Sequence, residues 1–588
     1  MQPFTFAFPK TKIPMQYSAD IQKLPRNYLP ADYTLTDWAG LEPFFKELAE
    51  RPIGSKVELG KWLLDMSELE AAVSEDACWR QIRMTCDTEN KALEEAFHFF
   101  VMEIQPHIQP YLDLLNRKLA ESPYLAELEA EDPAYLTYLR TVRKNIELFR
   151  EENIPLQSEL SILQQQYGQV TGRMSIEHNG QEFTMQQAAK FLQSKNRDER
   201  ETVYRKMQER RLQDKENLND LYTKLVAIRQ QVAQNTGFDN YRDYKFKELG
   251  RFDYTKEDCF RFHEGVKKYV VPLVNVIYEH KRKALGVDTL RPWDLEAEPE
   301  GVKPLKPFSS GEELLQKSIA CLEKLNPFFA GCFRTMQKMG HFDLESRKGK
   351  APGGYNCPLP ESGAPFIFMN AVGQMDDVTT MVHEGGHAVH SFLAHNLSLS
   401  SFKEYPMEIA EVASMAMELF TMDHWDVFFE NEEELKRAKI HQLERAITIF
   451  PWIATVDKFQ HWAYEHPQHT EDERAAAWMG LLDEFKVEAL DTSGLEPYRQ
   501  YGWQRQLHLF EVPFYYIEYG IAQLGAIGLW MQYKQNPQQA IDRYIHALSL
   551  GGTRTLPALY EAAGIRFDFS PEHIQELAAF VNEEMNRV

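Results

Sequence analysis

The sequence has few cysteines, no excess of positive charge and no long apolar run free of charge. Its six cysteines, about one per hundred residues, form no CxxC pair, which excludes a disulfide scaffold and favours reduced thiols. The longest apolar stretch, VPFYYIEYGIAQLGAIGLWM, contains Glu518 and three tyrosines. Such residues favour a buried helix over a membrane span, so we expect no membrane partner.

The net charge, the N-terminal segment and the length limit the partners, the location and the architecture that we expect. A formal net charge of -23 would repel nucleic-acid phosphates, so we expect no nucleic-acid partner. The N-terminal segment MQPFTFAFPKTKIPMQY lacks a basic start followed by an apolar run. It therefore predicts no signal peptide, and with it a cytoplasmic location. A chain of 588 residues exceeds what one hydrophobic core serves, so we expect two or more lobes.

Most of the chain has apolar residues at three- and four-residue steps, as in residues 68–121 and 198–237, which predicts long amphipathic helices. Two segments break this pattern. Residues 172–185 alternate around Asn179-Gly180, which indicates a β-hairpin. Residues 345–372 begin as a Gly/Pro-rich loop and end in an apolar run that suits a strand. The sequence thus predicts a mainly α protein with a small β-sheet.

The stretch MVHEGGHAVHSF, residues 381–392, contains His383, Glu384 and His387. On a helix, residues i and i+4 share a face, so both imidazoles can reach one metal ion. Neutral imidazole nitrogens suit zinc, at bond lengths of about 2.0–2.1 Å. Glu384 would lie beside the ion and take a proton from a metal-bound water. A pair of surface histidines is the competing interpretation.

The residues around this motif add two expectations. Gly385 and Gly386 each cost a helix up to about 1 kcal/mol relative to alanine, so they predict the close approach of another backbone segment. Asp376 and Asp377 stand where an N-cap is expected. We expect His390, one turn further on, to pack or to support the site, because one straight helix rarely closes a tetrahedral site.

The segment YPMEIAEVASMAMELF, residues 405–420, is the nearest downstream source of a third ligand. It carries Glu408, Glu411 and Glu418, and the first two share a helical face. Their apolar neighbours predict burial, and buried carboxylates need a partner such as a metal. Spacing alone does not choose between Glu408 and Glu411, and a solvated acidic pair is the alternative.

HEGGHAVH followed by EIAEVAS resembles the zinc oligopeptidases of the thimet oligopeptidase and oligoendopeptidase F family. LRPWDL (290–295), GKAPGGYN and HLFEVPFYYIEYG are also similar to features of that family. The resemblance implies that Glu411 is the third zinc ligand. It also implies that Glu408 orients a ligating histidine.

The C-terminal aromatic cluster, QLHLFEVPFYYIEYG, contains three tyrosines that are most simply core or interface residues. The resemblance implies instead that His508, Tyr516 and Tyr519 reach the zinc site. Tyr516 and Tyr519 are three residues apart and share a helical face. A phenol or an imidazole N–H can stabilise the oxyanion that forms when water attacks a carbonyl, at roughly 3–4 kcal/mol per donor.

The resemblance further implies two mostly helical lobes around a deep channel that admits short unfolded peptides. We assign residues 1–200 to an N-terminal helical lobe and residues 201–588 to a catalytic zinc peptidase domain. The expected activity is that of a zinc metalloendopeptidase, with one zinc ion held by the two motif histidines and Glu411. We also expect the strand at 366–372 to pair with the substrate backbone as an edge strand.

Two other functions stay open. A zinc carboxypeptidase or dipeptidase with a similar helical cleft would need a cation that captures a terminal carboxylate, for which Arg505 is a candidate. A non-catalytic peptide-binding protein with a structural zinc is the other. The presence of Glu384 disfavours it, and so do the three apparent protein ligands, which leave the site open as catalysis requires.

Overall fold

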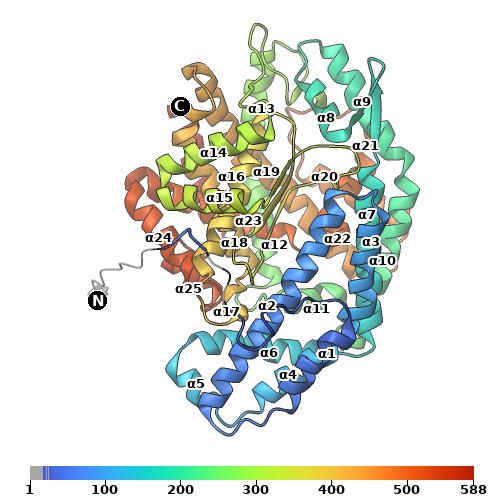
Figure 1. The fold of residues 1–588 in the computed structure, drawn as a ribbon. Helices are drawn as coiled ribbons and strands as arrows, with labels where there is room; N and C mark the ends of the chain where they lie inside the picture. The colour runs from blue at the N-terminus through green and yellow to red at the C-terminus, as the bar shows by residue number, and fades with distance from the viewer. Residues whose placement is uncertain (1–16, 22, 24) are drawn as a thin grey trace, which may run out of the picture.

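A computed structural model describes residues 17–588 except residues 22 and 24. The segment from which no signal peptide was predicted lies almost entirely outside these residues. The chain is mainly helical, with two small sheets, as the sequence predicts (Figure 1). In the described part of the chain, no helix is both long enough and apolar enough to cross a membrane.

The α-helices follow one another along the chain in three groups. The first group has these bounds: α1 (Trp38–Glu50), α2 (Lys56–Cys86), α3 (Lys91–Phe99), α4 (Gln105–Ala120), α5 (Leu125–Glu131), α6 (Ala134–Leu148) and α7 (Asn153–Gly172). The second group runs from the hairpin to the central sheet: α8 (Met185–Ala189), α9 (Arg197–Gln213), α10 (Lys215–Asn235), α11 (Tyr241–Glu248), α12 (Lys256–Gly265), α13 (Val271–Leu285), α14 (Gly311–Leu325) and α15 (Pro327–Met339). The third group completes the chain: α16 (Met375–Ala394), α17 (Ser400–Lys403), α18 (Met407–Thr421), α19 (Glu432–Glu465), α20 (Glu471–Glu484), α21 (Glu496–Gln500), α22 (Leu507–Glu511), α23 (Tyr516–Gln535), α24 (Pro537–Ser549), α25 (Leu556–Ala562) and α26 (Pro571–Arg587).

The hydrophobic residues form two large clusters. One joins α1, α2, α4, α5 and α6, the blue and cyan helices at the bottom of Figure 1, and also takes in Leu399 and Phe402. The other runs from Leu148 to Val581 and contains most of the remaining helices. The division between the clusters lies nearer residue 148 than 200, and the assignment of 1–200 and 201–588 as domains stays a prediction.

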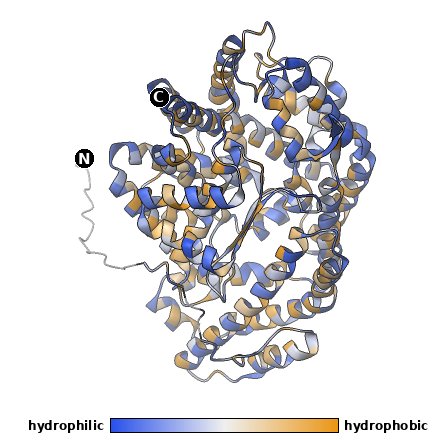
Figure 2. Cartoon of the chain, turned by 45° about the horizontal axis from the view of Figure 1, so that its top comes forward, coloured by the Kyte–Doolittle hydropathy of each residue, from blue (hydrophilic) through white to orange (hydrophobic). Residues whose placement is uncertain are grey.

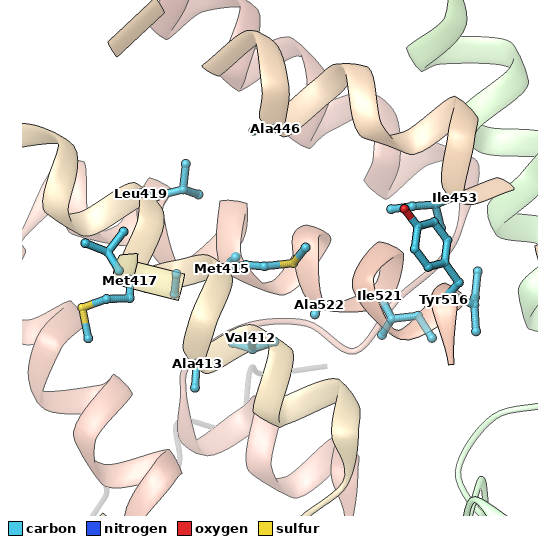
Figure 3. Packing of buried hydrophobic residues seen from close by; sticks show 14 of the residues in the cluster. Val412, Ala413, Met415, Met417, Leu419, Ala446, Ile453, Tyr516, Ile521 and Ala522 are labelled. Atoms are coloured by element: carbon cyan, nitrogen blue, oxygen red, sulfur yellow. The ribbon is translucent and has the colours of Figure 1, made fainter. Parts of the chain in front are cut away.

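Helix α18 lies in the middle of the larger cluster. All of its residues except Met407 are buried, because α16 covers one side and α23 covers another. Figure 3 shows Val412, Met415 and Leu419 of α18 beside Ala446 of α19 and Ala522 of α23. The acidic residues of α18 therefore lie in an apolar environment. Figure 2 shows that hydrophilic residues lie on the outward faces of the peripheral helices.

The predicted hairpin is confirmed. Strands β1 (Ser175–His178) and β2 (Gln181–Thr184) pair antiparallel across Asn179 and Gly180, whose φ angles are 51° and 75°. Positive φ at both central residues is typical of the tight turn that matches strand twist, and asparagine and glycine tolerate it best.

The second sheet differs from the sequence-based expectation. Its order is β3 (Phe342–Glu345), β5 (Phe366–Ala371), β4 (Tyr355–Cys357), so β5 is the central strand. The expectation that the strand at 366–372 is an edge strand was wrong. Both of its sides are occupied, by β3 in parallel and by β4 antiparallel. The free edge next to the histidine helix belongs to β4.

Candidate metal centre

Helices α16 and α18 touch through their backbones where the two glycines stand. A Cβ atom on Gly386 would lie 2.4 Å from the carbonyl oxygen of Ala413 on α18. One on Gly385 would lie 2.9 Å from the ring of Phe333 on α15. No side chain fits at Gly386, because the obstacle is main chain rather than a flexible side chain. The close approach predicted from the glycines is confirmed, and α18 is the neighbouring segment.

The start of α16 is held by a single carboxylate. Oδ2 of Asp377 accepts hydrogen bonds from the backbone N–H groups of Val372, Gly373 and Gln374, each at 2.8 Å. Gln374 is the N-cap, and Asp377 is the third residue of a capping box. The expectation that an aspartate is the N-cap itself is corrected, because these aspartates lie inside the first turn, where a negative charge favours the helix.

The side chains of His383, His387 and Glu411 converge between these helices. Oε2 of Glu411 lies 3.3 Å from Nε2 of His383 and 3.5 Å from Nε2 of His387. One donor atom from each residue lies within 4.8 Å of the other two. Tetrahedral zinc with bonds of about 2.0–2.1 Å separates its donor atoms by about 3.3 Å. The donor set and its spacing therefore fit one zinc ion.

A second carboxylate fixes the orientation of His383. Oε1 of Glu418 lies 2.7 Å from Nδ1 of His383, and its Oε2 accepts a hydrogen bond from Gln442 at 2.7 Å. Gln442 in turn accepts one from Thr379 on α16. Because an ionised carboxylate only accepts, Nδ1 of His383 donates its proton to Glu418, and Nε2 is the ring nitrogen that faces Glu411.

The expectation that Glu408 orients a ligating histidine is therefore corrected. Glu408 is buried, and its Oε1 accepts a hydrogen bond from the hydroxyl of Tyr254 at 2.6 Å. Glu418 follows Glu411 by seven residues, two helical turns, and so lies on the same stripe of α18. Glu408 lies one turn before Glu411 and contacts Tyr254, which precedes α12, so the helical spacing alone does not separate the two carboxylates.

Glu384 points its carboxylate into the same region without a partner. Its side chain is buried, and Oε2 makes no hydrogen bond to any described residue. Burial raises the pKa of this carboxyl above its ordinary value. A buried acceptor with no protein partner has room for a water or a substrate group.

Glu411 has a further partner that sequence reasoning missed. The hydroxyl of Tyr515 donates a short hydrogen bond to Oε1 of Glu411, which leaves Oε2 toward the histidines. Tyr515 was seen as part of the aromatic cluster, but nothing in the spacing separated it from its neighbours. Tyr515 is the N-cap residue of α23, so the direction of its side chain depends on how the chain enters that helix.

A chain of hydrogen bonds fixes the tautomer of His508. Trp452 Nε1–H donates to Oε1 of Gln506 at 2.8 Å, and Nε2 of Gln506 lies 2.6 Å from Nδ1 of His508. Indole N–H can only donate, so the Gln506 oxygen is the acceptor and its NH₂ donates to His508. A neutral His508 therefore carries its proton on Nε2, which lies 3.2 Å from the hydroxyl of Tyr519. Burial lowers the pKa of His508 to about 4, which keeps it neutral.

Tyr516 lies differently from the other two predicted residues. Its ring packs against His508 and Tyr519, with centroids 4.9 and 5.3 Å away, and it belongs to the hydrophobic core beside Ile453 (Figure 3). It is not among the residues that line the main cavity, whereas His508 and Tyr519 are. Its role as an oxyanion donor stays a prediction. His390 is buried and stacks on Tyr405.

A cavity of about 1160 Å³ opens onto this site. Helices α2, α4, α6 and α7 form one wall, and α22 and the approach to β4 form another. The three converging donor residues do not line it themselves. The cavity reaches them through His508, Tyr519 and the segment 353–355, where a Cβ on Gly354 would lie 3.8 Å from Oε1 of Glu384.

Comparison with known proteins gives consistent matches. The sequence pattern of peptidase family M3 matches residues 190–579, and that of the peptidase M3 N-terminal domain matches residues 29–149. The chain is similar to an oligoendopeptidase F homolog of Borreliella burgdorferi, with 23% identity over 48% of each chain. It is also similar to oligopeptidase PepF of Bacillus subtilis, with 23% identity over 70% of this chain and 60% of the relative.

The matches to these curated relatives span about half to three fifths of their lengths. Structural similarity extends further. A solved structure of PZ peptidase A with inhibitor 2 superposes with a TM-score of 0.90 and 26% identity, over 95% of this chain and 98% of that chain. The fold described above is thus shared along almost the whole length of both chains.

Proposed function

Because this chain belongs to peptidase family M3, we propose that it is a zinc-dependent metalloendopeptidase that hydrolyses internal bonds of short, unfolded peptides. The observation that carries the proposal is the convergence of two histidines and a glutamate next to a buried, unpartnered carboxylate oxygen of Glu384. This combination provides three metal ligands, an open coordination position and a base at one place.

His383, His387 and Glu411 would hold the zinc ion. When bound, zinc supplies Lewis acidity, which lowers the pKa of a coordinated water and polarises the scissile carbonyl. Glu384 takes a proton from the attacking water and later passes it to the leaving amine nitrogen.

Tyr519 stabilises the oxyanion, and His508 supports Tyr519. Nε2–H of His508 points at the Tyr519 hydroxyl, so that hydroxyl accepts from His508 and has its own proton free to donate. Burial raises the pKa of Tyr519 further above its ordinary value, so the phenol keeps its proton at neutral pH. Both groups line the cavity, where a substrate carbonyl would lie.

The substrate backbone would pair with β4. This three-residue strand has β5 on one side only, and Tyr355 and the preceding glycines line the cavity. An extended peptide can add to such an edge through main-chain hydrogen bonds, which are indifferent to its side chains. The cavity is larger than a typical small-molecule pocket of about 300–1,000 Å³, which suits several peptide residues.

We propose a cytoplasmic location because of the state of the cysteines. All six cysteines are free, and four of them are buried, as expected for a protein of a reducing compartment. The occupants of its cavity would then be peptides released by other proteases.

Cleavage of a peptide of about ten residues, acetylated and amidated at its ends and internally quenched, tests this function directly. We expect zinc-loaded protein to cut it at internal bonds, and a chelator to abolish the cleavage. Product masses identify the bonds. Zinc bound at the site with no cleavage of several such peptides would contradict the proposal.

Peptides with a free C-terminus, added to the same experiment, test the carboxypeptidase alternative. One observation supports that alternative. Arg505 lines the cavity, stacks on Trp452 at 4.4 Å and forms no ion pair with any described residue. A free guanidinium in a cavity can bind a peptide carboxylate. If peptides with a free C-terminus are cut only near that end and amidated ones are not cut, the enzyme is a carboxypeptidase.

Replacing Glu418 with glutamine is expected to weaken zinc binding by about 10- to 100-fold, because the hydrogen bond that orients His383 and raises its basicity is weakened. Competition with a zinc chelator of known affinity measures this change. Glu408→Gln is the matched control, on the same helix and equally buried, and should bind zinc with unchanged affinity. A larger loss in Glu408→Gln than in Glu418→Gln would restore Glu408 to the role first expected of it.

A further inference from the structure

A second group of metal-binding side chains lies between α12 and α19. Helix α12 carries Cys259 and His263, and α19 carries Asp457 and His461. Each pair is four residues apart, so each helix presents both side chains on one face. The two faces meet although the helices are almost two hundred residues apart in sequence: Cys259, Asp457 and His461 converge, and His263 contacts them through Asp457.

The distances within this cluster suit a shared ion. Oδ2 of Asp457 lies 2.9 Å from Nε2 of His263 and 3.3 Å from Nε2 of His461. Cys259, Asp457 and His461 each offer a ligand atom within 4.8 Å of the other two. Donors on one tetrahedral zinc ion lie about 3.3 Å apart for nitrogen and oxygen, and somewhat farther for sulfur.

Hydrogen bonding alone leaves the cluster unsatisfied. All four residues are at most 2% exposed. Among the residues that the structure describes, none is a hydrogen-bond partner of Oδ1 of Asp457, Nδ1 of His263 or either ring nitrogen of His461. The close approach of His461 to Asp457 is not aligned as a hydrogen bond. Buried polar atoms in folded proteins are nearly always paired, so several orphans in one place indicate an unseen partner.

The charge of the cluster points to a divalent cation. Asp457 is fully buried, and within the described part of the chain no lysine or arginine pairs with it. A cysteine thiolate and a carboxylate would together balance the two positive charges of zinc, with the thiol proton released to solvent.

We propose that Cys259, His263, Asp457 and His461 form a second, structural metal site that binds zinc, separate from the peptidase site. Four protein donors and full burial leave no open position, as in structural zinc sites. The mixture of one sulfur, two nitrogens and one oxygen suits zinc better than calcium or magnesium, which prefer oxygen alone.

The position of this site suggests what it stabilises. The ring of His461 packs against Phe514, with centroids 5.5 Å apart, and Phe514 has a φ of 66°, rare for a residue with a side chain. The next residue is Tyr515, which donates to Glu411. The second ion would thus hold α12 to α19 directly beneath the turn that presents Tyr515 to the first site.

Metal counting on the full-length protein tests this proposal. After dialysis against a small excess of zinc, we expect two zinc ions per chain in the wild type. His383→Ala/His387→Ala should retain one ion, and Cys259→Ser/Asp457→Asn should also retain one. One ion per chain in the wild type, lost entirely in the double histidine variant, would overturn the proposal.

Cobalt(II) substitution gives a readout that needs no variant of the cluster. A cysteine thiolate on cobalt produces a near-ultraviolet charge-transfer band, whereas a site of two histidines and a glutamate has no thiolate to produce one. We expect the band in the wild type and in Cys332→Ser, a control at another buried cysteine, and its loss in Cys259→Ser. Absence of the band in fully cobalt-loaded wild type refutes the site, whether or not peptides are cleaved.

Discussion

Replacing Glu384 with glutamine is expected to lower kcat/KM by about 10²- to 10⁴-fold while the zinc content stays unchanged, because the amide has the same shape but cannot accept a proton. The unpartnered Oε2 of Glu384 is the acceptor that is lost. The measurement is the initial rate on the quenched peptide together with zinc per chain, determined on the same preparation.

Glu444→Gln is the matched control for this variant. Burial raises the pKa of Glu444 as it does that of Glu384, but Glu444 lies on α19 and does not line the cavity. Its replacement should leave the rate within about twofold of wild type, as for ordinary substitutions away from the site. More than a tenth of wild-type activity in Glu384→Gln would show that another group is the base.

Replacing Tyr519 with phenylalanine is expected to lower kcat by about 10²- to 10³-fold with little change in KM, because its hydroxyl would contact the oxyanion and not the ground-state carbonyl. The His508–Tyr519 contact and the position of both groups on the cavity wall support this expectation. Steady-state kinetics on the quenched peptide separates the two constants.

Two other tyrosines of α23 serve as comparisons in this experiment. Tyr533→Phe, on the same helix and packed against Phe420, should behave as wild type. Tyr516→Phe should lose much less activity than Tyr519→Phe, because Tyr516 lies in the core and does not line the cavity. Equal losses in Tyr516→Phe and Tyr519→Phe would give Tyr516 the role that the sequence resemblance implies.

Short sequence patterns were enough to predict several local features of the fold and the site. The four-residue spacing of His383 and His387 needs only a helix to bring both rings to one side, and Asn179-Gly180 needs only a tight turn. The glycine pair in α16 likewise indicated a close neighbour, because glycine in a helix is costly without one. Each of these inferences rests on interactions within a few residues of sequence.

Interactions between distant segments could not be predicted in the same way. Glu418 rather than Glu408 contacts His383 because of the angle and register at which α18 crosses α16, and no spacing rule contains that angle. Strand order is equally invisible, so β5 was expected at an edge. The pairing of Cys259 and His263 with Asp457 and His461 requires two helices from different parts of the chain to meet.

The backbone contact at Gly386 also bears on how the three donor residues are held at their spacing. Main-chain atoms of α16 and α18 fix the separation between the histidines and Glu411, at a spacing that suits a metal ion. Small zinc domains, by contrast, acquire their fold from the metal. We therefore expect that the free energy of binding a metal at the proposed site is not needed for folding, so that the metal could be exchanged from a protein that stays folded.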